Sequence, residues 1–132
     1  MSPSFVIHLA DSEVARIEPQ GAALQLVFSA ATAQAQEPGQ APLAGSLLGL
    51  TLVVDQAHAQ GMAVLGDGLG RLRSAVLHAG GQRLTGWALP WAGVAEGTLA
   101  LEFANGSQVS ITGRDWRLLT PQPLRFMPSY AC

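Results

Sequence analysis

Residues 98–112 read TLALEFANGSQVSIT, and they contain an apolar alternation on each side of an Asn-Gly pair. Leu99, Leu101 and Phe103 alternate with smaller or polar residues, and residues 109–111 (VSI) resume the same period of two after the turn. Alternation of this kind places one face of a β-strand in a core. The stretch therefore predicts a β-hairpin with one buried face.

The length of the hairpin loop follows from the same alternation. A two-residue loop at Asn105 and Gly106 would turn the apolar sides of the two strands to opposite faces, which a half-buried sheet does not tolerate. A three-residue loop, 104–106, places Leu101 opposite Val109. We therefore predict a type I turn that is followed by Gly106 in the left-handed conformation.

Short apolar runs separated by turn residues fill the rest of the chain. There are fifteen glycines and eight prolines, and the alternation returns at residues 5–9 and 24–28. Asp11 and Ser12 predict a bulge or bend in the first strand region. Short connections favour antiparallel neighbours. The sequence predicts one all-β domain over residues 1–132, an antiparallel meander with little helix, closed into a small barrel or arranged as a two-sheet sandwich.

Two glycine-rich stretches predict turns. Residues 66–70 (GDGLG) lack the sixth-position glycine of a dinucleotide fingerprint, so we expect a turn there rather than a cofactor site. Gly80 and Gly81 predict a two-residue hairpin loop that places Arg83 opposite His78.

Two segments lack a clear strand pattern. Residues 30–42 are rich in Ala, Gln and Pro, and they predict a long loop. Residues 47–60 leave strand and helix both open. The β-branched residues Thr51 and Val53 favour a buried strand, whereas residues 56–60 are compatible with a helical turn.

The alternating apolar positions define a predicted core. Its members are Phe5, Ile7, Leu24, Leu26, Phe28, Leu52, Val76, Leu99, Leu101, Phe103, Val109 and Ile111.

Composition restricts the class of protein and of partner. Hydrophobic residues make up 48% of the chain and charged residues 12%, which excludes a charge-rich disordered chain. The formal charge is -2, and all the bases are arginine, so the sequence has no basic footprint for nucleic acid. The single cysteine, Cys132, excludes an internal disulfide framework.

Targeting signals are also lacking in the sequence. The first residues have no basic region of a secretory signal. The longest mostly apolar stretch, residues 43–54, is shorter than the roughly 20 residues of a membrane-spanning helix. We therefore expect a cytoplasmic protein with no membrane partner.

The chain contains no local pattern that identifies a catalytic centre. It has no nucleophile elbow, and its histidines, His8, His58 and His78, are far apart in the sequence. We therefore predict no catalytic residue, metal site or cofactor, and we favour a non-enzymatic module that binds a protein or a small apolar ligand. The alternative is an enzyme or metal-dependent protein whose site is assembled from these three histidines on separate strands.

The aromatic segment at residues 87–91 (WALPW) is where we expect a ligand if the barrel has a pocket, whereas a barrel filled by its own side chains is the favoured alternative. Trp87 and Trp91 surround a proline that ends a strand, so an indole at the rim of a small barrel would be available to an apolar group. Arg83 on the same strand could bind an anion together with Arg71 and Arg73, although a solvated rim is the favoured interpretation of these arginines. The low charge also predicts self-association, and we expect a homodimer.

Overall fold

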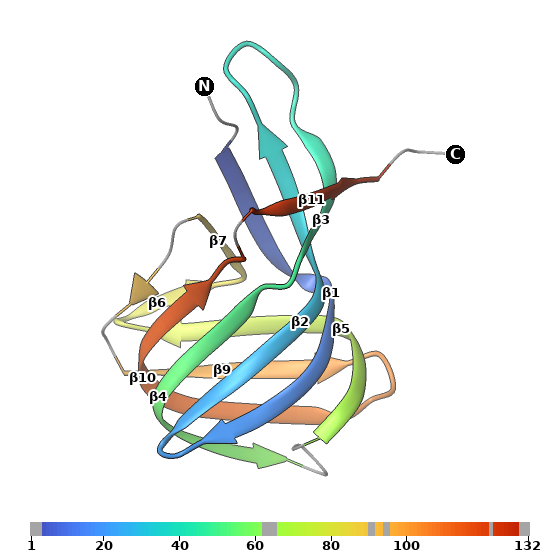
Figure 1. Ribbon diagram of the computed structural model, residues 1–132. Coiled ribbons are helices and arrows are strands. Elements are labelled where there is room, and N and C mark those ends of the chain that lie inside the picture. Colours follow the sequence, from blue (N-terminus) through green and yellow to red (C-terminus); the bar gives the residue numbers. More distant parts are fainter. Residues whose placement is uncertain (1–3, 62–65, 90–91, 94–95, 122, 130–132) are drawn as a thin grey trace.

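The structure is a computed structural model that describes residues 4–61, 66–89, 92–93, 96–121 and 123–129. All regular elements in these ranges are β-strands, which confirms the predicted all-β class (Figure 1). The strands are β1 (Ser4–Gln20), β2 (Ala23–Gln36), β3 (Leu43–Leu48), β4 (Thr51–Gly61), β5 (Gly66–Ala79), β6 (Gln82–Leu84), β7 (Gly86–Ala88), β8 (Ala92–Gly93), β9 (Gly97–Phe103), β10 (Gln108–Leu119) and β11 (Arg125–Pro128). Within the same ranges, no helix is long and apolar enough to cross a membrane.

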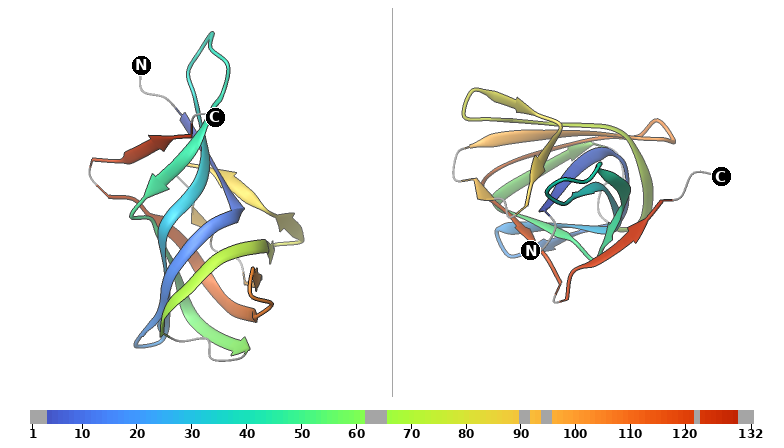
Figure 2. Two further views of the ribbon diagram at one scale, coloured as in Figure 1. Left: turned by 90° about the vertical axis from the view of Figure 1, so that its right-hand side faces the viewer. Right: turned by 90° about the horizontal axis from the view of Figure 1, so that it is seen from above.

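Six strands close into an antiparallel barrel (Figure 2). They follow one another in the order β1, β2, β4, β10, β9 and β5, and the pairing of β5 with β1 closes the ring. Of the two predicted architectures, the structure is therefore the barrel. The closure leaves no free edge along the paired part of these six strands.

Among the six barrel strands, the order departs from the predicted meander at one connection. β4 lies between β2 and β10, whereas the next strand in the sequence, β5, lies between β9 and β1. Turn residues identify hairpins, but they do not determine where a strand pairs after a longer connection. The turn predicted at residues 66–70 is also wrong, because these residues begin β5 and Asp67 pairs with Arg16 of β1.

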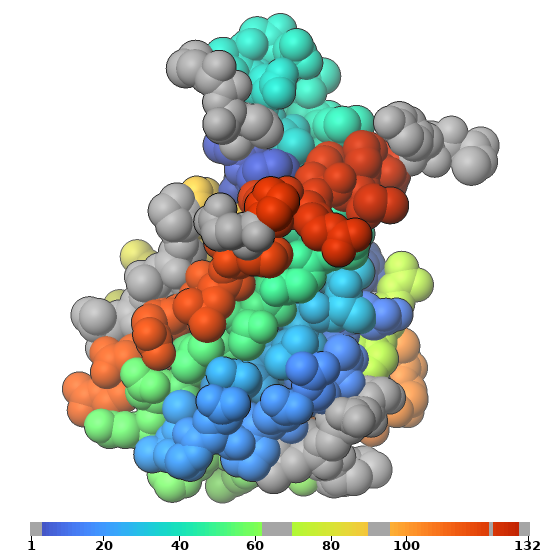
Figure 3. Space-filling model, viewed as in Figure 1, coloured from blue at the N-terminus to red at the C-terminus, as the bar shows by residue number. Residues whose placement is uncertain are grey.

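Part of the sheet extends beyond the barrel as a projection, which we call the arm (Figures 1 and 3). The arm consists of residues 4–8 of β1, residues 31–36 of β2, β3 and β11, paired in that order. The loop that joins β2 to β3 lies at its tip.

The predicted bulge at Asp11 and Ser12 marks the border between the arm and the barrel. The register of β1 against β2 shifts between His8 and Glu13, and Asp11 has a φ of 66°. The hydroxyl of Ser12 donates to the His8 carbonyl at 2.8 Å and accepts the Thr32 N–H at 2.9 Å. The buried hydroxyl thus satisfies backbone groups that the bulge removes from the ladder.

The long loop predicted at residues 30–42 is wrong for most of its length. β2 continues far into this segment, and only residues 37–42 connect it to β3. Ala31 and Ala33 are fully buried and alternate with polar neighbours, so the run is a strand with small side chains inside. Alanine is depleted in strands in general, and for that reason the composition suggested a loop.

Residues 47–60, which the sequence left open, contain strand and no helix. β3 ends and β4 begins within this segment. Gln56 has a φ of 50°, and the register of β4 against β10 shifts between Asp55 and His58. The part that was compatible with a helical turn is therefore a bulge in a strand.

All predicted core residues except Phe5 and Val76 are buried. Phe5 is half-buried in the arm, and Val76 lies on the outer face of β5. The register of β5 against β9 shifts between Leu72 and Ser74, so Ala75 and Leu77 take the inward positions. A bulge reverses which side chains of a strand point inward, and apolar character alone does not reveal it.

Candidate functional site

The barrel interior is filled by inward-facing side chains from its strands. The fully buried members of this cluster include Leu26, Leu52, Leu72, Leu77, Leu99, Ile111 and Trp116. A filled interior is usual for a barrel of this size. The hollows described below lie at the outer surface and at the arm, and core residues contribute to the lining of the largest one.

The predicted ligand residues fall into different environments. Trp87 lies in β7 opposite Ile7, and its side chain is 7% exposed within the core. Arg83 lies in β6 opposite His78, as predicted, and it lines a hollow of about 360 Å³ at the Gly80–Gly81 turn. Trp91 lies outside the described residues. The described part of the predicted site therefore combines a buried indole and an exposed guanidinium.

The three histidines occupy three different strands. His8 lies on β1, whereas His58 on β4 and His78 on β5 stand at the two ends of one cross-strand row. Thr98 and Thr112 separate them within this row, with their hydroxyl oxygens 3.3 Å apart. In the described ranges, no three His, Cys, Asp or Glu residues gather as a group that could hold a metal ion.

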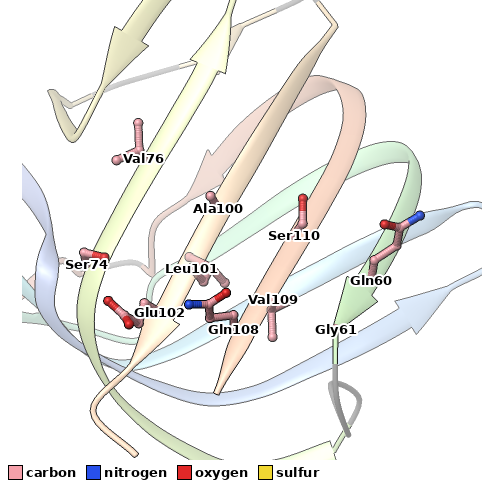
Figure 4. Close-up of a pocket in the computed structure, with 10 residues that line it drawn as sticks. All are labelled: Gln60, Gly61, Ser74, Val76, Ala100, Leu101, Glu102, Gln108, Val109 and Ser110. Carbon is pink, nitrogen blue, oxygen red and sulfur yellow. The ribbon is translucent and has the colours of Figure 1, made fainter. Parts of the chain in front are cut away.

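The middle of the outer face of β5, β9, β10 and β4 carries mostly small, uncharged side chains, and we call this part of the face the wall. Its central row runs from Val76 through Ala100 and Ser110 to Gln60, each the cross-strand partner of the next. A depression of about 490 Å³ surrounds this row (Figure 4). It forms because short side chains in the middle are flanked by longer ones such as Glu102.

Glu102 is the only charged residue that lines the depression among those the structure describes. Its carboxylate is 3.7 Å from the Arg73 guanidinium, which also donates to the Ala104 carbonyl at 3.0 Å. Because this ion pair is largely exposed, it contributes little to stability. The wall is thus almost free of unpaired charge, which is typical of the centre of a protein interface.

The third hollow lies at the end of the arm, and we call it the arm pocket. It has a volume of about 270 Å³. Its lining residues are Phe5, Ala35, Glu37, Gln40, Ala41, Leu43 and Phe126. Most of these are apolar, whereas a carboxylate and an amide come from the loop at the tip.

The arm pocket exists because the arm curls strongly. Phe5 lies on β1 and Phe126 on β11, the two outer strands of the arm, yet their ring centroids are 5.4 Å apart with the planes tilted by 47°. Gly45 of β3 makes room for this contact. A Cβ atom at Gly45 would lie 2.6 Å from the Phe126 ring, closer than any side chain tolerates.

The tip of the arm supplies the other wall of the arm pocket. Leu43 begins β3 opposite Ala35, and it remains 43% exposed. The loop turns back through a hydrogen bond from the Gln40 N–H to the Glu37 carbonyl at 3.1 Å. An exposed leucine beside two phenylalanine rings is an apolar surface that gains free energy when it is covered.

Comparison with known proteins identifies no relative of this chain. No family model, no curated protein and no solved structure matches it. The class that the fold defines is a closed six-stranded antiparallel barrel with a projecting arm.

The sequence did not single out the arm pocket. Phe5 was expected in the core, residues 37–42 were assigned to a long loop, and Phe126 was not assigned to any element. The available signal was the alternation of alanine with polar residues in 31–36, which predicts a strand with a small-residue face. The contact between Phe5 and Phe126 joins the two ends of the chain, and no local pattern predicts it.

Proposed function

We propose that this chain is a non-enzymatic binding module that takes a small apolar ligand in the arm pocket. The supporting observation is an apolar hollow between Phe5, Leu43 and Phe126, outside a barrel whose interior its own side chains fill. Apolar pockets with a few polar groups are the usual sites of small ligands.

The size of the arm pocket restricts the ligand. A volume of about 270 Å³ is just below the ~300–1,000 Å³ of sites for drug-sized molecules. A single aliphatic chain or one aromatic ring therefore fits better than a fused ring system. Each methylene that leaves water contributes about 0.8 kcal/mol, so a chain of several carbons gives measurable affinity after the cost of association.

The test is a titration with 1-octanol, followed by NMR of the backbone amides. We expect saturable shifts at Ala35, Gln40 and Leu43. Ala41→Trp places a large side chain in the arm pocket, and it should weaken binding at least tenfold. Met127→Gln is the matched control, because Met127 is 57% exposed and neighbours Phe126 in the same strand but does not line the hollow.

The proposal fails if no saturable shift occurs at these amides. It also fails if Ala41→Trp, with an unchanged barrel spectrum, binds octanol as tightly as Met127→Gln does. Either result would leave the arm pocket without a ligand function.

A second candidate function is interaction with a protein through the wall. The observation that favours it is the nearly uncharged depression around Ala100 on a regular four-stranded face. The occupant that we propose for this face is a second copy of the chain, because two sheet faces with short side chains can pack against each other with these side chains interdigitated. The oligomeric state tests this candidate, as set out in the Discussion.

A further inference from the structure

We infer that the arm pocket selects a cation, namely a short aliphatic or arylalkyl amine in its protonated form. This inference rests on the proposed function and names the class of ligand. It depends on the charges and aromatic rings that line the arm pocket, in addition to its apolar character.

Glu37 carries the only charge in the described lining of the arm pocket. It is the first residue of the loop at the tip, and it is exposed. No described residue forms an ion pair with Glu37. Its charge is therefore available to a ligand.

The other lining residues of the arm pocket suit the rest of an amine. Phe5 and Phe126 form a tilted pair, and their ring surfaces can cover a short apolar chain. Gln40 adds a side-chain amide whose oxygen can accept a hydrogen bond from an ammonium group. An amine with a short chain would place its carbon atoms against the rings and Leu43 and its ammonium group near Glu37.

The same features disfavour an anionic ligand of the same length. A fatty acid would bring its carboxylate near Glu37, and the described lining offers no arginine or histidine to compensate. Repulsion between like charges is a common basis of specificity against a competing ligand. The net charge of -2 acts in the same direction over longer distances.

Three probes of equal chain length separate charge from apolar burial: octylammonium, 1-octanol and octanoate. We expect octylammonium to bind about fivefold more tightly than octanol. This ratio corresponds to the attraction between the ammonium group and one exposed carboxylate that lies about 4 Å away in water. Octanoate should bind more weakly than octanol. The preference for octylammonium should decrease at high salt, because the carboxylate is exposed.

Glu37→Gln removes the charge and keeps the shape of the side chain. In this variant octylammonium and octanol should bind equally well, while the affinity for octanol stays at the wild-type value and shows that the arm is intact. Glu96→Gln is the matched control, because Glu96 is an exposed carboxylate that lines the hollow at the Gly80–Gly81 turn. It should keep the fivefold preference.

The outcomes distinguish this inference from the proposed function. If octanol binds but octylammonium binds no more tightly, or if Glu37→Gln keeps the preference, the inference is overturned and the proposed function stands. If octanoate binds most tightly, the site is one for anions and the inference is again overturned. If none of the three probes binds, both the inference and the proposed function fail.

Discussion

Leu101 and Val109 face each other across the hairpin of β9 and β10, and both side chains are buried. The pairing requires a three-residue loop. The Gly106 N–H donates to the Phe103 carbonyl at 2.9 Å, and the Phe103 N–H donates to the Ser107 carbonyl at 2.8 Å. The register and the loop predicted from the alternation are therefore confirmed.

Gly106→Val should lower the stability of the protein through the backbone alone. Gly106 has a φ of 92°, and no atom lies within 4 Å of the position that a Cβ would take. A β-branched residue resists positive φ, so we expect the free energy of unfolding to fall by about 1 kcal/mol or more. Gln108→Val, at an exposed position of β10, should change it by less than about 0.5 kcal/mol. Urea denaturation measures both, and equal effects would contradict the strained turn.

Ser12→Ala should destabilise the protein more than the loss of one exposed hydroxyl does. Ser12 is fully buried, and its removal leaves the His8 carbonyl and the Thr32 N–H without their partner at the bulge. An unsatisfied buried polar group costs about 1–3 kcal/mol. Ser29→Ala removes an exposed hydroxyl and serves as the control.

The comparison is again made by chemical denaturation. Hydrogen exchange at Thr32 adds a local readout, because its N–H should exchange faster in Ser12→Ala than in Ser29→Ala. Equal stability of the two variants would show that the hydroxyl of Ser12 does not stabilise the bulge.

Ala100→Arg should abolish self-association of the chain. The wall contains polar as well as apolar side chains, unlike the strongly apolar interfaces of obligate dimers, so we expect a weak dimer whose population rises with protein concentration. A long arginine side chain at the centre of the depression would hold the second copy away from the short side chains around it. Sedimentation velocity over a range of concentrations should show a dimer for the wild type and a monomer for the variant.

Gln25→Arg is the control for the added charge. Gln25 lies on β2, outside the wall, so this variant should still dimerise. The wall is not a contact surface if the wild type stays monomeric at the highest concentration. The same conclusion follows if the Ala100→Arg variant associates as strongly as Gln25→Arg does.

Local sequence patterns were sufficient for the hairpin of β9 and β10 and for the tight turn between β5 and β6. The alternation around Leu101 and Val109 determined the hairpin register, and Gly80 and Gly81, with φ values of 57° and 78°, form the two-residue turn that the sequence predicted. These features depend on residues that are close in the sequence, so the chain specifies them through side-chain periodicity and backbone conformation.

The order of the strands and the arm pocket depended on contacts between distant parts of the chain. The pairing of β5 with β1 closes the barrel, and the contact between Phe5 and Phe126 closes the arm over Gly45. Val76 faces outward because a bulge changes the phase of β5 relative to β9. Many pairings suit the same alternation, and only the packing of the whole sheet selects among them. The tertiary structure alone therefore decided the strand order and formed the arm pocket.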